Sequence, residues 1–299
     1  CILKMLTVFD AFCGAGGSST GLRDASLDVR HAANHWQVAI DSHAANHPNT
    51  EHSCVDLHQT HPAYFPTTDI GWFSIECTTH SPAGGRKRKH PGQLHLWQRQ
   101  SDPALIKSRM GAWDVVNFAE FHAYPFLVVE NVPAFSDWRL FDHWLESFTL
   151  TGYSYQILSF NSQFTYPVAV PQSRDRIYIV FHKRGLKQPD LDFRPVAECP
   201  EHGSIRAVQS WKNPMRRRIG QYNAQYVYRC PECGVQVDPM TAPAADALDW
   251  SLPLVKIKDR ARPLSKNTLA RIKKGLMRFW PDLSGPYIDT YRNNGRLRS

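Results

Sequence analysis

The stretch Leu6-Thr-Val-Phe-Asp-Ala-Phe-Cys-Gly-Ala-Gly-Gly-Ser-Ser-Thr-Gly-Leu22 decides the fold. A short run of β-forming residues, 6–12, leads into a glycine-rich turn, 13–17, and a helix is expected to begin at Ser18. Glycines let the backbone pass close beneath a ligand, and the first turn of a helix offers free N–H groups to an anion. This order is typical of nucleotide-type α/β folds, although the turn departs from the spacing G-x-G-x-x-G and a plain structural turn fits it about as well.

Alternating β and α patterns continue from this opening to about residue 185. Further strands are expected at 31–36, 53–57, 69–75, 125–132, 154–160 and 170–181, and helices at 39–47, 104–123 and 138–150. Such alternation predicts an α/β fold with a largely parallel, doubly wound sheet. In these sheets, ligands bind outside the carboxyl ends of the strands.

Reactive side chains follow several of the expected strands. Cys77 follows an apolar run and precedes a basic segment, 83–102, that is expected to be a loop. A buried small hydrophobe is the commonest fate of a free cysteine, but a thiol at this edge also suits a nucleophile acting on a polyanion. Glu130 ends another apolar run, either as a surface terminus or as a carboxylate held for acid–base chemistry. Arg174 and Arg176 are spaced so that both side chains share one face of the strand they enter, unless this is simply a solvated edge.

Trp36 and Asp56 follow two neighbouring strands. An aromatic ring can stack on a purine, and a carboxylate can accept a hydrogen bond from an exocyclic amine. Ordinary packing also accounts for Trp36 when that residue is considered alone.

Two pairs of candidate metal ligands lie beyond residue 190. Cys199-Pro-Glu-His202 and Cys230-Pro-Glu-Cys233 together supply four nitrogen and sulfur ligands, the tetrahedral set that zinc prefers. Two coincidental pairs would have the same spacing. Because the chain has seven cysteines, an odd number, and no export signal, the cysteines are expected to be reduced, some as ligands of a structural zinc ion. The segment between the pairs, 203–229, is rich in arginine and aromatic residues, which suits contacts with nucleic acid or the solvated face of a small zinc-stapled ribbon.

Composition restricts the class of protein. The chain has 299 residues, 42% of them hydrophobic, which is adequate for a packed core, and its net charge is +8. That charge favours a polyanionic partner, nucleic acid before membrane, although a merely soluble basic protein would carry it too. No run approaches the ~20 apolar residues that cross a bilayer, and no signal-peptide pattern is present, so a cytoplasmic location is expected. A basic amphipathic helix is expected at 264–280.

In chain order, these motifs resemble those of the DNA (cytosine-5) methyltransferases. The resemblance covers about residues 5–185 and implies a Rossmann-like fold of the class I type, with S-adenosyl-L-methionine (AdoMet) as cofactor. It also implies a prokaryotic or phage-encoded protein of the restriction-modification kind, with a small zinc-binding insertion. The positions that match the cofactor motifs are Phe12, Gly14, Gly16, Gly17, His35, Trp36, Asp56 and Leu57.

The catalytic motifs of the family fall on four residues, Cys77, Glu130, Arg174 and Arg176. The resemblance implies methylation of C5 of cytosine in double-stranded DNA, with a covalent bond between the cysteine and C6 of a flipped-out base. Residues expected to contact the DNA are Arg86, Lys87, Arg88, Lys89, Arg109, Arg216, Arg217 and Arg218.

The chain departs from the family pattern in three ways. Glu76 stands before the cysteine where the family has proline, and His35 replaces the acid that binds the AdoMet ribose. The later motifs of the family are absent, so a longer chain or a partner subunit is expected to supply them. These departures leave open a catalytically silent DNA-binding subunit, and methylation of RNA such as tRNA is a further alternative. The expected domains are a catalytic domain at 1–190, a basic zinc-ribbon-like insertion at 191–245 and a basic helical segment at 246–299.

Overall fold

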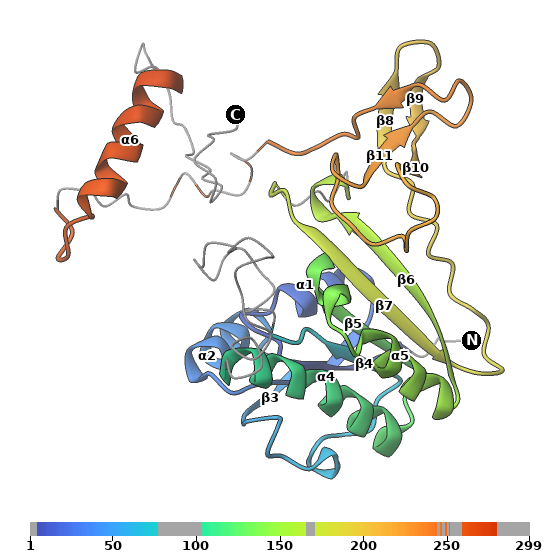
Figure 1. Cartoon of the computed structure of the whole chain (residues 1–299). Coiled ribbons are helices and arrows are strands. Elements are labelled where there is room, and N and C mark those ends of the chain that lie inside the picture. The colour runs from blue at the N-terminus through green and yellow to red at the C-terminus, as the bar shows by residue number, and fades with distance from the viewer. Residues whose placement is uncertain are drawn as a thin grey trace. The chain divides into compact units, whose positions relative to one another are not determined.

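Seven strands form one sheet in the order β3-β2-β1-β4-β5-β7-β6 (Figure 1). The computed structural model describes residues 5–76, 103–165, 171–243 and 259–279, with residues 246, 249 and 251 between the last two ranges. The strands are β1 (Thr7–Ala11), β2 (Asp28–Asn34), β3 (Glu51–Cys54), β4 (Ile70–Phe73), β5 (Phe126–Asn131), β6 (Tyr153–Asn161) and β7 (Asp175–Lys183). The first five run parallel, and β7 runs antiparallel to both β5 and β6. The predicted Rossmann-like, mostly parallel sheet is confirmed.

Alternating side chains on each strand separate the two faces of the sheet. On β1, Phe9 and Ala11 point into the main core, whereas Val8 packs with Leu22 and Ile70 on the opposite face. This period of two is what a strand buried on both sides requires. The helices that connect the strands are α1 (Gly17–Asp24), α2 (Gln37–Asn46), α4 (Pro103–His122) and α5 (Phe141–Leu150). Short 3₁₀ turns lie at Pro62–Tyr64, Pro133–Asp137 and Ser162–Phe164.

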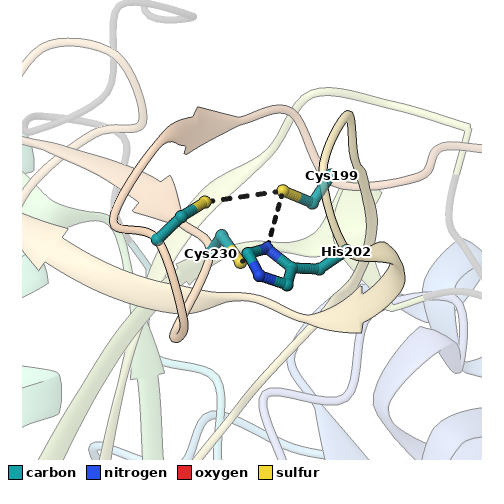
Figure 2. A group of neighbouring side chains, drawn as sticks. Cys199, His202 and Cys230 are labelled. Atoms are coloured by element: carbon teal, nitrogen blue, oxygen red, sulfur yellow. Dashed lines mark hydrogen bonds between the residues drawn. The ribbon is translucent and has the colours of Figure 1, made fainter.

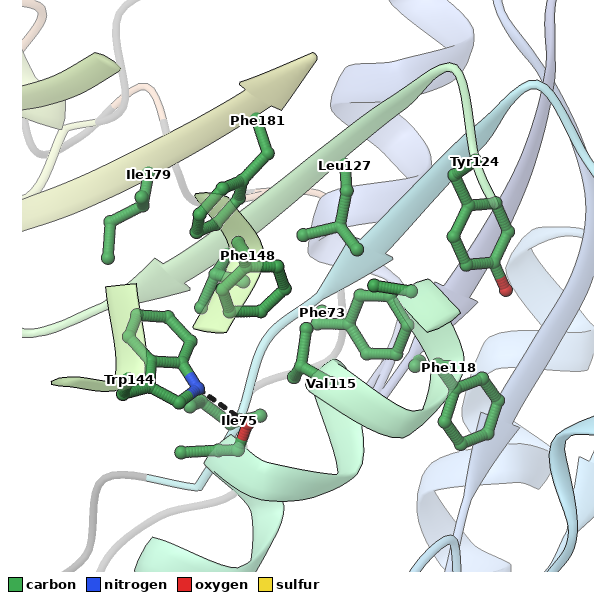
Figure 3. Packing of buried hydrophobic residues seen from close by; sticks show 14 of the residues in the cluster. Phe73, Ile75, Val115, Phe118, Tyr124, Leu127, Trp144, Phe148, Ile179 and Phe181 are labelled. Atoms are coloured by element: carbon green, nitrogen blue, oxygen red, sulfur yellow. Dashed lines mark hydrogen bonds between the residues drawn. The ribbon is translucent and has the colours of Figure 1, made fainter. Parts of the chain in front are cut away.

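The main core lies between the sheet and helices α4 and α5 (Figure 3). On α5, the buried side chains stand at positions 141, 144, 145 and 148, the spacing of one helical face. Trp144 is fully buried, and its indole N–H donates a hydrogen bond of 2.7 Å to the carbonyl of Ala112 on α4. Burial of each such large side chain stabilises the fold by about 1.5–3 kcal/mol.

The described chain falls into two compact units. The first contains the sheet with its helices and also the segment Val208–Arg229; the second contains Ser162–Arg174, Pro195–Ala207 and the residues from Cys230 onwards. In the first unit, β10 (Val208–Trp211) pairs antiparallel with β11 (Tyr226–Arg229). The expected domain boundaries stay a prediction.

Hydrogen bonds explain why segment 208–229 packs with the sheet. The Gln209 amide donates to the carbonyl of Ser159 at 2.7 Å, and the Ser159 hydroxyl donates to the carbonyl of Gly220 at 3.1 Å. The backbone N–H of Tyr222 donates to Asp175 Oδ1 at 3.0 Å. The ends of β6 and β7 therefore hold this segment.

The described part of the second unit contains short strands and one longer helix. Strand β8 (Val196–Cys199) pairs antiparallel with β9 (Gly203–Arg206), and β12 is Gln236–Val237. Helix α6, Lys266–Phe279, lies where the sequence predicted a basic helix. Within the described ranges, no helix combines the length and the apolar composition that a membrane span needs.

Candidate active site and metal centre

The glycine-rich turn follows β1 at the carboxyl edge of the sheet. Phe12, Gly14 and Gly16 have φ angles of 58°, 55° and 99°, in the left-handed region that favours glycine. A Cβ atom on Gly16 would lie 2.8 Å from the ring of His47, so no larger residue fits there. At Gly14 and Gly17, by contrast, no described atom lies within 4 Å of such a Cβ atom. One side of the turn is therefore closely packed, and the other is open to a ligand.

A buried carboxylate lies behind the turn. The side chain of Asp10 accepts hydrogen bonds of 2.6 Å from the hydroxyls of Ser18 and Ser19 at the start of α1. Burial raises the pKa of Asp10 to about 6, and the bonds from the two serines oppose this rise. The carboxylate thus fixes the first turn of α1 against β1.

Two histidines of α2 hold the same turn from its packed side. His47 Nε2 lies 3.1 Å from the carbonyl oxygen of Gly16, and His43 Nε2 lies 2.9 Å from the hydroxyl of Ser19. Burial, with the neighbouring rings of His47 and His52, lowers the pKa of His43 to about 4, so His43 is neutral at neutral pH. Sequence reasoning missed these residues, and their i, i+4 spacing was the signal that both occupy one helical face.

The expected adenosine-binding residues surround this edge in different environments. Trp36 precedes α2 with 59% of its surface exposed, so its ring is available for stacking. Its backbone N–H donates to Asn34 Oδ1 at 3.0 Å. Asp56 accepts a hydrogen bond of 3.1 Å from the backbone N–H of His58, while Leu57 is buried in the core.

His35 and Glu76, which depart from the family pattern, lie next to each other. The distance from His35 Nδ1 to Glu76 Oε1 is 3.6 Å, with 43% and 35% of the two side chains exposed. His35 follows β2 and Glu76 follows β4, and both strands pair with β1. Their contact therefore crosses the end of the strand that leads into the glycine turn.

Glu130 and Arg176 form an ion pair at the ends of β5 and β7. Arg176 Nε donates to Glu130 Oε1 at 2.8 Å, and each side chain is 15% exposed. Glu130 lies opposite Tyr178, so Arg176 is its diagonal neighbour on the same face of the sheet. Strand β7 begins at Asp175, which places Arg174 before the strand, where it is exposed.

The predicted nucleophile and the basic run at 86–89 lie outside the described residues. The chain that leads to Cys77 is nevertheless tied to the glutamate strand, because the Asn131 amide donates to the carbonyl of Ile75 at 3.4 Å. The expected residues Arg86, Lys87, Arg88 and Lys89 belong to the undescribed range.

The other expected DNA contacts are described. Arg109 lies on α4 with its Nε buried, and no described group accepts a hydrogen bond from that atom. Burial, with the positive charge of Arg139, lowers the pKa of Arg109. Arg216 and Arg218 are exposed, whereas Arg217 pairs with Asp142.

The four predicted metal ligands meet in the second unit (Figure 2). Their ligand atoms all lie within 4.8 Å of one another, and Cys199 Sγ is 3.6 Å from both His202 Nδ1 and Cys233 Sγ. Cys230 Sγ is also 3.6 Å from His202 Nδ1. Zinc bonds of about 2.3 Å to sulfur and 2.0–2.1 Å to nitrogen place tetrahedral ligands about 3.5–3.8 Å apart. The cluster therefore fits one metal ion.

Local backbone geometry builds this cluster from two similar turns. Each ligand pair is followed by a glycine in the left-handed region, Gly203 with φ 65° and Gly234 with φ 72°. His202 Nε2 lies 3.4 Å from the carboxylate of Glu232. Such a contact with a carboxylate orients many metal-binding histidines. Burial opposes ionisation of Cys199, but hydrogen bonds from the backbone of Glu201 and from His202 lower its pKa to about 6. Cys199 is thus favoured as a thiolate, the form in which a cysteine binds a metal.

Comparison with known proteins identifies the family. The model of the C-5 cytosine-specific DNA methylases matches residues 6–228. The type II methyltransferase M.HgiCII of Herpetosiphon aurantiacus is 27% identical over 204 residues, which are 67% of this chain and 42% of that protein, so the chain spans less than half the length of this relative. A putative DNA modification methyltransferase encoded within a prophage of E. coli is 22% identical, with a TM-score of 0.49 over 64% of this chain and 51% of its own. The S. pombe Dnmt2 methyltransferase is 18% identical, with a TM-score of 0.47 over 62% and 54%. Because the family model matches well over half of its residues, the chain belongs to the C-5 cytosine-specific DNA methylase family.

Proposed function

We propose that the protein transfers a methyl group from AdoMet to C5 of cytosine in double-stranded DNA. The observation that carries this proposal is the contact between Glu130 and Arg176 beside the segment that leads to Cys77. A carboxyl group and a guanidinium group at one sheet edge can bind the polar edge of a single base. Arg174 is a second candidate for that edge.

Cys77 is the proposed nucleophile, and the ring of cytosine explains why one is needed. C5 is a poor nucleophile until a thiolate adds to C6, which makes the ring enamine-like. Glu130 would hydrogen-bond N3 and Arg176 would hold O2, so both stabilise the charge that develops on the ring. After C5 has been methylated, loss of the C5 proton to a base and elimination of the thiolate restore the double bond and free Cys77.

The glycine turn and its surroundings fit AdoMet. When bound, AdoMet supplies an electrophilic methyl group. The open side of Gly14 and Gly17 leaves room for it, and the first N–H groups of α1 can bind its carboxylate. The exposed ring of Trp36 can stack on the adenine, and Asp56 can accept from its amino group.

DNA is the proposed polyanionic partner. The target atom is stacked inside a duplex, so the cytosine must leave the helix to reach Glu130. Arg109 on α4 and the exposed arginines at 216–218 are the described candidates for phosphate contacts.

We also propose that Cys199, His202, Cys230 and Cys233 hold one structural zinc ion. The set has the ligand types, the number and the spacing of a closed tetrahedral site. All four positions are filled by protein, which leaves none for a substrate, so the ion would stabilise the fold.

Transfer of labelled methyl groups from AdoMet to DNA tests the proposed activity. Cys77→Ser should reduce transfer to background, because a hydroxyl is a much weaker nucleophile than a thiolate, while AdoMet binding is retained. Glu130→Gln should lower the rate of methyl transfer about 10²–10⁴-fold, the usual effect of losing an acid–base group. Cys54→Ser is the control and should keep full activity, because a hydroxyl can still donate to the carbonyl of His35 as the exposed thiol does.

Two results would contradict the proposal. Full turnover by Cys77→Ser would rule out this residue as the nucleophile. Absence of transfer by the wild-type chain to any DNA, with DNA binding intact, would instead indicate a catalytically silent DNA-binding subunit.

A further inference from the structure

We propose that Glu76 is the carboxylate that binds the ribose hydroxyl groups of AdoMet, and that His35 holds this carboxylate in position. The inference rests on the proposed binding of AdoMet at the glycine turn and adds the recognition of its sugar. Glu76 would be a binding residue, and His35 a positioning residue.

The strand order places these two residues on either side of the turn. Strands β2 and β4 both pair with β1, so His35 after β2 and Glu76 after β4 flank the point where β1 enters the glycines. Their side chains meet at 3.6 Å, and both remain partly exposed. The carboxylate therefore lies at this edge with part of its surface exposed, and its contact with the histidine restricts its motion.

The order of groups within AdoMet locates the ribose. The ribose joins the adenine to the methionine part of the molecule. If the adenine stacks on Trp36 and the carboxylate binds at the start of α1, the sugar must lie between these two points. His35 is the chain neighbour of Trp36, and its contact with Glu76 crosses the end of β1. The pair therefore lies where the ribose must pass.

A carboxylate is the group that binds ribose hydroxyls in nucleotide-type folds, because it accepts a hydrogen bond from each of two neighbouring hydroxyls. The other described acids at this edge have different roles. Asp10 is fully buried and accepts from Ser18 and Ser19, and Asp56 accepts from the backbone of its own loop. Glu76 combines partial exposure with a place beside the turn.

The two departures from the family pattern then have one explanation. The resemblance leads one to expect a ribose-binding acid at position 35 and a proline at position 76, where this chain has His35 and Glu76. The carboxylate that is missing at the end of β2 is present at the end of β4, and the contact of 3.6 Å joins the two positions. The proposed site therefore has its carboxylate at the end of β4 and not at the end of β2.

Binding of S-adenosyl-L-homocysteine and its 2′-deoxyribose analogue to the full chain tests the proposal by calorimetry. Glu76→Gln should weaken the ribose ligand about 10–100-fold, the effect of losing a charged hydrogen-bond partner, and should weaken the deoxy analogue much less. The matched control is Glu51→Gln, because Glu51 also contacts a histidine, at 3.5 Å, but lies at the amino end of β3. That variant should bind both ligands like the wild type.

A second pair of variants tests whether a carboxylate at position 35 can replace the one at position 76. Glu76→Pro alone should weaken binding at least as much as Glu76→Gln, and combining it with His35→Glu should recover most of the loss. Thermal unfolding of each variant checks that it is folded. An equal loss for both ligands in Glu76→Gln, or no loss, would overturn the ribose assignment while wild-type binding upholds the proposed function. Failure of the wild type to bind either ligand would overturn both.

Discussion

In the sheet unit, Trp144, Phe148 and Phe181 are completely buried, whereas the described part of the second unit brings three thiols and an imidazole together. Apart from Phe164, the described hydrophobic residues that the second unit buries are small ones, Ala197, Cys199, Ala207, Cys230 and Val237. Apolar burial is the main force that offsets the entropy of folding. A few small buried side chains therefore contribute little to the stability of the second unit. The comparison teaches that the stability of the first unit should depend on core packing, and that of the second on a bound metal.

Removal of the metal should produce the largest difference in stability between the two units. Structural zinc ions contribute about 10–16 kcal/mol of binding energy to small domains that fold around them. Cys230→Ser should therefore abolish zinc binding and unfold the segments 195–207 and 230–243, while the sheet remains folded. Zinc content by emission spectroscopy and hydrogen exchange of the two segments measure both effects.

The control for this prediction is Cys54→Ser, which removes an exposed thiol outside the cluster. It should leave zinc content and exchange unchanged. If the segments stay protected in Cys230→Ser after zinc is lost, the second unit does not depend on its metal and the comparison fails.

Truncation of a core side chain should destabilise the sheet unit and leave the metal site of the second unit intact. Trp144→Ala removes a fully buried ring that packs against Phe135 and Phe181 and donates to the carbonyl of Ala112. Loss of an aromatic side chain from a core costs about 3–5 kcal/mol, so the sheet unit should unfold at much lower denaturant concentration. Zinc content should stay at the wild-type level.

A substitution on the same helix provides the control. Leu150 ends α5 with 81% of its surface exposed, so Leu150→Ala should change the free energy of unfolding by less than about 0.5 kcal/mol. Loss of zinc on Trp144→Ala would show that the two units do not fold independently.

The sequence predicted the parts of each unit that depend on local pattern. Strands such as β5 are apolar runs between turn residues, and both Cys-Pro-Glu pairs have a fixed ligand spacing. The predicted bounds of the second strand lie too far toward the C-terminus. The structure has β2 at Asp28–Asn34 rather than 31–36, because Val29 pairs with Val8 and Trp36 instead caps α2.

Contacts between distant parts of the chain could not be predicted in this way. The contact of His35 with Glu76 depends on strand order, and the contact of His47 with Gly16 depends on how α2 packs. The bonds from Ser159 and Asp175 to the segment 208–229 join residues that sequence pattern treats as unrelated. Periodicity reports which face of an element is apolar, and it carries no information about the element that covers that face.

The smallest predicted effect is a pH dependence that belongs to the sheet unit alone. The pKa of Asp10 is raised from its ordinary 3.8 to about 6 because the side chain is buried. Its folded pKa therefore lies above its unfolded value, so the stability it contributes is complete below about pH 4 and is lost as the pH rises through 6. The shift corresponds to on the order of 3 kcal/mol. Asp10→Asn cannot ionise, so the free energy of unfolding of the wild type minus that of the variant should fall between pH 4 and pH 6 and then level off.

Urea unfolding at a series of pH values measures this difference, and taking the difference removes the contributions of titratable groups that are not linked to Asp10. Asp24→Asn, at an exposed acid of α1, should give a flat difference. A flat difference for Asp10→Asn as well would mean that its serine partners compensate fully for burial. Acid should act in opposite directions on the two units, because it removes a buried charge from the sheet unit but protonates the ligands that hold metal in the second.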